Sequence, residues 1–214
     1  MDNRRTTDAP PPKMMNNNSF FKFTDPKGTH TGGIELPAAF WSRGYEYHWA
    51  RQFTWTDFVV AEMGAGWSGR PWKEELADTC EEVYAVDLDP RFLSLPVTRP
   101  NLHFVLADFR KKVNLPPLDR VFCISVLEEL DDYRDAVKEF YRLLKSNGLL
   151  VITCDAQYDM DKPLPKYPGV SFEKLFEALS DAGFIIPLDT SLDKEGAFYI
   201  EQWNLACWHG VFAK

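Results

Sequence analysis

Apolar segments alternate with segments of helical periodicity from residue 57 to residue 184, and this alternation limits the folds open to the chain. The apolar segments are 57–63, 81–89, 101–109, 118–130 and 148–155. Each is short and apolar enough to be a buried strand. Helices are predicted over 72–80, 131–148 and 171–184, the second with Asp131 or Asp132 as its cap and Gly148 after its end. Strands that alternate with helices form parallel βαβ units, so the pattern predicts an α/β fold with a sheet covered on both faces.

The regions at the two ends of the chain differ from this pattern. Residues 1–19 are polar and rich in Pro and Asn, which predicts a disordered tail. Residues 20–55 are dense in aromatic side chains, and we expect one or two short helices there, forming a lid over the edge of the main domain at 56–214. The segments 184–192 and 197–214 are predicted as two further strands in a hairpin. Prolines after the second and third strands predict short or irregular crossovers.

Composition narrows the possible functions. The 214 residues include 24 Lys and Arg against 32 Asp and Glu, a formal charge of -8, which argues against sequence-independent binding of nucleic acid. No segment approaches the roughly 20 apolar residues that span a bilayer, and no secretory signal is present, so we expect a cytoplasmic protein without a membrane partner. The four cysteines are far apart, which favours buried free thiols and gives no metal signature.

Polar residues and glycines follow consecutive predicted strands. The first strand leads into Glu62 and the glycine-rich turn of "VVAEMGAGWSG", the second ends at Asp87, and the third ends at Asp108 and Phe109. The fourth ends near Ser125. Parallel strands place their carboxyl ends at one edge, where ligands of open α/β sheets bind. Each feature alone could be a turn, a helix cap or a solvated loop, but their succession favours a ligand that contains adenosine.

The residue types fit such a ligand. Glycines at 64 and 66 let the backbone approach it closely. Asp87 could accept hydrogen bonds from both ribose hydroxyls, and it follows the glycine turn at about the expected distance of ~20 residues. Asp108 could accept from the adenine amine, with Phe109 covering the ring. Ser68 stands where dinucleotide-binding folds usually have their third glycine, which disfavours an NAD-dependent or nucleotide-sugar enzyme.

These segments resemble the class I S-adenosylmethionine-dependent methyltransferases over about three quarters of the chain. The similar motifs are "VVAEMGAGWSG", "VYAVDLDP", "VLADF", "LDRVFCISVLEEL" and "LLKSNGLLVIT". The resemblance implies a Rossmann-like, doubly wound, mostly parallel sheet of seven strands whose last strand is antiparallel. It also implies S-adenosylmethionine as cofactor and S-adenosylhomocysteine as product. The chain departs from the family at Glu129, where a histidine is frequent, and it has no Asn/Asp-Pro-Pro-Tyr motif of nucleic-acid methyltransferases.

The strand-end pattern and the resemblance together give a set of candidate cofactor contacts. They are Glu62, Gly64, Ala65, Gly66, Trp67, Asp87, Leu88, Asp108, Phe109, Ser125 and Arg43. Arg43 is a candidate partner of the cofactor's methionine carboxylate. His48 is the best candidate for a general base, although a histidine in such a segment is more often an ordinary member of an aromatic cluster. Asp155 follows the fifth strand and could contact substrate or cap the strand.

The expected function is therefore methyl transfer from S-adenosylmethionine to a small-molecule acceptor. The alternative is a non-catalytic module that binds S-adenosylmethionine and serves an interaction. The sequence does not identify the acceptor, its reacting atom or the oligomeric state.

Overall fold

The computed structural model describes residues 18–66, 71–162 and 169–214; Trp67 lies outside them. One mixed sheet dominates, with the strand order β1-β10-β8-β7-β4-β5-β6, and β9 pairs with β10. The strands are β1 (Ser19–Phe20), β4 (Val59–Met63), β5 (Glu82–Asp87), β6 (Leu102–Leu106), β7 (Leu118–Ile124), β8 (Leu144–Gln157), β9 (Tyr199–Ile200) and β10 (Leu205–Ala213). Neighbours from β6 to β8 are parallel and β10 is antiparallel to β8. The predicted seven-stranded, mostly parallel sheet with an antiparallel last strand is confirmed.

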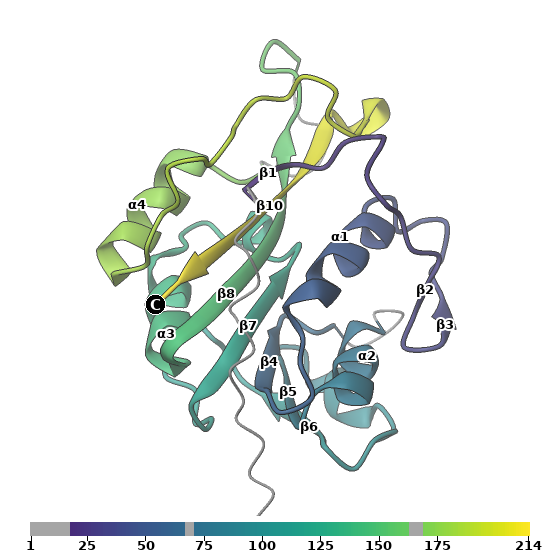
Figure 1. Ribbon diagram of the computed structural model, residues 1–214, viewed down its shortest axis with the longest axis vertical. Helices are drawn as coiled ribbons and strands as arrows, with labels where there is room; N and C mark the ends of the chain where they lie inside the picture. The colour runs from purple at the N-terminus through teal and green to yellow at the C-terminus, as the bar shows by residue number, and fades with distance from the viewer. Residues whose placement is uncertain (1–17, 67–70, 163–168) are drawn as a thin grey trace, which may run out of the picture.

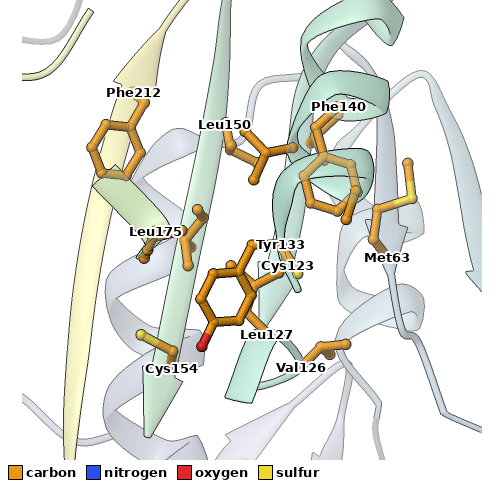
Figure 2. Packing of buried hydrophobic residues seen from close by; sticks show 14 of the residues in the cluster. Met63, Cys123, Val126, Leu127, Tyr133, Phe140, Leu150, Cys154, Leu175 and Phe212 are labelled. Atoms are coloured by element: carbon orange, nitrogen blue, oxygen red, sulfur yellow. The ribbon is translucent and has the colours of Figure 1, made fainter. Parts of the chain in front are cut away.

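Helices cover both faces of the sheet, as Figure 1 shows: α1 (Arg43–Ala50) and α2 (Trp72–Thr79) on one side, α3 (Arg134–Leu143) and α4 (Phe172–Ala182) on the other. Each layer has its own hydrophobic core, because alternate strand residues point to opposite faces. On the α3 and α4 side, Phe140 and Leu175 gather around Leu150 of β8 (Figure 2). Tyr47 of α1 stacks on Trp72 of α2 on the opposite side.

The helix predictions are confirmed, with one changed boundary. α4 begins after Ser171 and ends at Gly183, whose φ of +99° is the left-handed conformation that glycine adopts readily. α3 follows Asp132, whose carboxylate accepts a hydrogen bond from the Arg134 backbone amide. α3 ends at Leu143 rather than near residue 148, because Leu144 already pairs with Leu118 of β7.

The crossovers after β5 and β6 are short, as the prolines predict. After β5 the chain forms a 3-10 helix, η2 (Pro90–Ser94), and the described residues 107–117 after β6 contain no helix. Three other 3-10 helices are η1 (Arg51–Phe53), η3 (Leu127–Glu129) and η4 (Glu201–Trp203).

The edge of the sheet corrects two expectations. The predicted strand at 184–192 is wrong, since within it a single bridge joins Ile185 to Ala213. The edge beside β10 belongs to β1, which pairs with His209 and Trp208, and Asn18 extends it by accepting a hydrogen bond from the Val211 amide. Ser19, assigned to the tail from sequence, thus lies in the sheet, and the side chain of Asn18 is hydrogen-bonded to it.

The predicted lid region contains α1, η1 and a small hairpin of β2 (His30–Thr31) and β3 (Ile34–Glu35). The four cysteines are free and buried, as expected. Among the described residues, no helix has the length and hydrophobicity to cross a bilayer.

Candidate active site

A glycine turn continues β4 and is hydrogen-bonded to the end of β5. The amides of Gly64 and Ala65 both donate to the Val86 carbonyl, at 2.9 and 3.1 Å. Gly64 has a φ of +77°, and a Cβ placed there would lie 2.5 Å from Cγ2 of Val126. Position 64 therefore requires glycine, both for its backbone conformation and for its contact with the segment after β7.

Asp87 ends β5 beside this turn. Its Oδ2 accepts from the Gly66 amide at 2.8 Å, and its Oδ1 accepts from the Asp89 amide at 2.9 Å. Each carboxylate oxygen has a second acceptor position, so the side chain is fixed in place and can still accept two further hydrogen bonds. Leu88, the next residue, is 59% exposed at the same edge.

Asp108 and Phe109 follow β6 but are engaged differently from expectation. Asp108 forms a two-point ion pair with Arg110, and the hydrogen bonds from Arg110 lower the pKa of Asp108. The Phe109 ring is buried and lies 5.5 Å from the ring of Phe140 on α3. This packing does not support the predicted stacking of Phe109 on an adenine.

Glu46 of α1 joins the ends of β7 and β8. It is fully buried and accepts hydrogen bonds from Ser125 Oγ at 2.7 Å and from Thr153 Oγ1 at 2.5 Å. Arg43, one helical turn earlier, donates Nη1 to both Glu46 oxygens at 2.7 and 2.9 Å. Burial alone would raise the pKa of Glu46, but Arg43 and hydrogen bonds from Ser42, Thr153 and Ser125 outweigh it and hold that pKa below its usual value.

Ser125 has a backbone conformation that is rare for its type. Its φ is +46°, and its amide donates to the Thr153 carbonyl at 2.9 Å. Non-glycine residues with positive φ are uncommon and persist where surrounding contacts hold them. Here the hydrogen bonds to Glu46 and to Thr153 hold Ser125 in this conformation just after the end of β7.

Two more carboxyl groups lie at the ends of β7 and β8. Asp155 follows Thr153 by two residues and so projects from the same face of β8. Glu128 lies in η3 after β7 and is 6% exposed. Burial raises the pKa of Asp155 to about 7, with Glu46 adding to the rise and Arg43 opposing it. Burial also raises the pKa of Glu128 well above its usual range, and Asp155 contributes.

The structure brings most of the sequence candidates to one edge. The glycine turn with Glu62 and Ala65, Asp87 and Leu88 lie at the ends of β4 and β5, and Ser125, Arg43 and Asp155 at the ends of β7 and β8. This edge includes the point between β4 and β7 where the strand order reverses. His48 is not brought to it: His48 is exposed and stands about 200° around α1 from Glu46.

Sequence reasoning did not select Glu46, Thr153 or Glu128. Glu46 stands three residues after Arg43 within a mostly aromatic segment, and this charged pair in apolar surroundings was a usable signal. Thr153 gave no signal, because its partner lies 107 residues away in the sequence.

Comparison with known proteins shows which domain and fold this chain is similar to. Residues 61–152 match the family model described as "Methyltransferase domain". The chain has the fold of the class I, S-adenosylmethionine-dependent methyltransferases. The matched region begins in β4, contains the glycine turn, Asp87 and the end of β7, and stops within β8 before Thr153 and Asp155. No curated protein matches the chain in sequence.

Solved structures support the methyltransferase fold at low identity. A putative S-adenosylmethionine-dependent methyltransferase from Listeria monocytogenes is 14% identical, with a TM-score of 0.58, covering 79% of this chain and 97% of that one. The N-methyltransferase NodS from Bradyrhizobium japonicum WM9, in complex with S-adenosylhomocysteine, is 15% identical, with a TM-score of 0.55 and coverages of 74% and 79%. The [4+2]-cyclase SpnF is 14% identical, with a TM-score of 0.65 and coverages of 91% and 88%.

Proposed function

We propose that this methyltransferase domain binds S-adenosylmethionine at the ends of β4 and β5 and methylates a small-molecule acceptor at the ends of β7 and β8. The observation that carries the proposal is the Asp87 carboxylate, which two backbone amides hold beside the glycine turn. A pair of ribose hydroxyls matches the two acceptor positions that remain on it. The Gly64 turn, with no room for a Cβ, suits a backbone that passes against a ligand.

The bound cofactor supplies an electrophilic methyl group on a sulfonium, which needs little covalent assistance from the protein. The residues of this chain would hold the acceptor in line with that methyl group and exclude water. Helix α1 is placed for this role, since Glu46 ties it to the ends of β7 and β8. Asp155 would accept a proton from the acceptor, because its pKa of about 7 lies close to neutral pH. Glu62, Ala65, Leu88 and Ser125 remain proposed cofactor neighbours, and Arg43 a proposed partner of the methionine carboxylate.

Replacing Asp87 with alanine is expected to weaken binding of S-adenosylmethionine and S-adenosylhomocysteine by at least about 1.5 kcal/mol, or roughly tenfold. The variant loses the ribose acceptor and also the hydrogen bond that positions Gly66. Calorimetric titration with both compounds, and with NAD as the comparison ligand, measures the change.

Asp119→Ala is the matched control for this titration. Asp119 also accepts a hydrogen bond from a backbone amide, that of Val59, but at the opposite end of β4. Its loss should leave affinity for the cofactor unchanged. Equal affinity of the Asp87→Ala variant and the parent protein would remove Asp87 from the proposed site.

The alternative is a domain that binds S-adenosylmethionine without methyl transfer. It merits a test because a protein described as a [4+2]-cyclase shares this fold. Formation of S-adenosylhomocysteine during incubation with a set of small-molecule acceptors separates the two. Tight cofactor binding without product from any acceptor would favour the alternative.

A further inference from the structure

The carboxyl groups at the ends of β7 and β8 outnumber the cations that neutralise them. Glu46 is matched by Arg43 and by two hydroxyl donors. Glu128 and Asp155 are matched less fully. Within the described ranges neither forms an ion pair, although the charge of Arg43 acts to lower the pKa of both. One oxygen of each, Glu128 Oε2 and Asp155 Oδ1, is buried without a hydrogen-bond partner. We call these two residues the open carboxyl pair.

Such a pair is costly to the free protein. A buried carboxylate oxygen without a hydrogen-bond partner loses its hydration and gains no hydrogen bond in exchange. Both groups respond by holding their protons more tightly, as their raised pKa values indicate. Buried polar groups that lack partners call for an explanation, and a ligand that supplies the missing contacts is one.

The charge of the open carboxyl pair restricts the chemistry of that ligand. A phosphate or carboxylate would be repelled by acids that already exceed the single arginine. In the parts of the chain that the structure describes, no group of three or more His, Cys, Asp or Glu side chains is arranged to hold a metal ion. A neutral hydroxyl would leave the charge uncompensated. An ammonium group offers both a positive charge and N–H donors to the two unbonded oxygens.

We propose that the methyl acceptor is an amine, bound as its ammonium form between Glu128 and Asp155; this rests on the proposed function. The open carboxyl pair then has two roles. It recognises the charged acceptor, and it receives the proton that the acceptor must lose before it can react. Both carboxylates touch the reacting group in this arrangement, and Asp155 keeps the place that the sequence suggested for a substrate contact.

The transfer step balances with these groups alone. The ammonium nitrogen gives one proton to a carboxylate of the pair and regains its lone pair. That lone pair forms the new bond to the methyl carbon, while the bond from this carbon to sulfur breaks and its electrons remain on sulfur. The products are the N-methylated amine, as its ammonium form, and S-adenosylhomocysteine.

The test compares amines with alcohols of the same shape. Protein saturated with S-adenosylhomocysteine is titrated with pairs such as 2-phenylethylamine and 2-phenylethanol, or ethylamine and ethanol, and binding is followed by calorimetry and melting temperature. At least one amine should bind at least about tenfold more tightly than its alcohol. Alcohols that bind as well as the amines, or a panel in which no amine binds, would overturn the proposal.

Substitutions in the open carboxyl pair test whether the amine binds there. Glu128→Gln and Asp155→Asn keep the shape of the side chains and remove the charge, so each should weaken amine binding at least about tenfold. Glu81→Gln is the control, because Glu81 is exposed and lies just before β5, at the opposite end of the parallel strands. It should change amine affinity less than about threefold. Amine binding that survives both substitutions in the open carboxyl pair would contradict the proposal.

The same variants separate this inference from the proposed function. If they bind S-adenosylmethionine as the parent does, the pair serves the acceptor. If their affinity for S-adenosylmethionine falls tenfold, the carboxylates belong to the cofactor and the amine proposal fails while the proposed function stands. If the parent does not bind S-adenosylmethionine at all, the proposed function itself fails.

The pH dependence of amine binding is a further check. The charged and titratable groups facing Asp155 are Glu46 and Arg43 from α1, Glu128 and Glu129 from η3, Cys154 beside it in β8 and Cys207 from β10. Because an ammonium binds the ionised carboxylate, affinity should increase as the pH rises through about 7, the pKa of Asp155. It should decrease again when the amine loses its own proton. Asp155→Asn should remove the rise near pH 7; a rise that persists in this variant would count against the role of Asp155.

Discussion

Replacing Glu46 with alanine is expected to lower the free energy of unfolding by about 3–5 kcal/mol, since it leaves a buried charge without its partner. Arg43, whose side chain is 11% exposed, would lose the carboxylate that neutralises it. Ser125 and Thr153 would lose the acceptor of their hydroxyl hydrogen bonds. Urea unfolding at neutral pH measures the effect. In a thermal scan it should appear as a decrease of about 10 °C for a chain of this length.

Two further variants test this explanation. Glu177→Ala removes a partner of Arg134 in an ion pair whose side chains are about half exposed, and should cost less than about 1 kcal/mol. Arg43→Met combined with Glu46→Leu removes both buried charges and should recover part of the stability lost in Glu46→Ala. If Glu46→Ala costs no more than Glu177→Ala, the buried network does not stabilise the fold in the way its geometry indicates.

The parts of the fold that the sequence predicted are those with a local signal. Apolar strands, the amphipathic helix α3 and the Ser171 and Gly183 boundaries of α4 depend on neighbours within a few positions. The glycine turn and Asp87 were found for the same reason. Their residue types and spacing follow from the backbone conformation and from the strand end, both of which are local properties.

The parts that sequence reasoning missed depend on distant partners. β1 contains two residues, too few for any periodicity, and its partner His209 lies 190 positions later. β1 occupies the free edge of β10, where the predicted strand at 184–192 would have paired. Within 184–192, only Ile185 bridges to β10. A competition between two segments for one edge cannot be read from either segment by itself.

The candidate site likewise has one part with a local sequence signal and another part that depends on distant partners. The end of β5 was predictable because Asp87 follows an apolar strand. The buried network was not, because Glu46 and Ser125 are 79 positions apart and no sequence pattern pairs them. Phe109 shows a limit of local sequence: its position after a strand suggested a ligand contact, and no local pattern indicated that its ring also contacts Phe140 of the core.

Replacing Gly64 with alanine is expected to lower the free energy of unfolding by about 2–5 kcal/mol. Two costs add. A non-glycine residue at φ +77° pays about 1–2 kcal/mol for its backbone conformation. The new methyl group would also lie 2.5 and 2.8 Å from the two terminal carbons of Val126, and crowding a packed core costs about 1–3 kcal/mol more. Val126 has little freedom to move, because it is buried within the hydrophobic cluster that Figure 2 shows.

Gly33 offers a control with the same backbone conformation and no crowding. Its φ is also +77°, and no atom of the described residues lies within 4 Å of a Cβ placed there. Gly33→Ala should therefore cost only the conformational share, about 1–2 kcal/mol. The difference between the two variants in urea unfolding measures the crowding at Val126. Equal costs at the two positions would mean that Val126 yields without penalty, and the turn would not require glycine for close packing.

A double variant connects this packing to the proposed cofactor site. Adding Val126→Ala to Gly64→Ala removes the clash and should recover the crowding cost, less the smaller loss from truncating a buried valine. In the folded fraction of Gly64→Ala, the displaced turn should move Gly66 away from Asp87 and weaken binding of S-adenosylmethionine roughly tenfold, or by about 1.4 kcal/mol. The double variant should recover that affinity together with the stability. Restored stability without restored binding would show that the methyl group itself, and not the displacement of the turn, blocks the ligand.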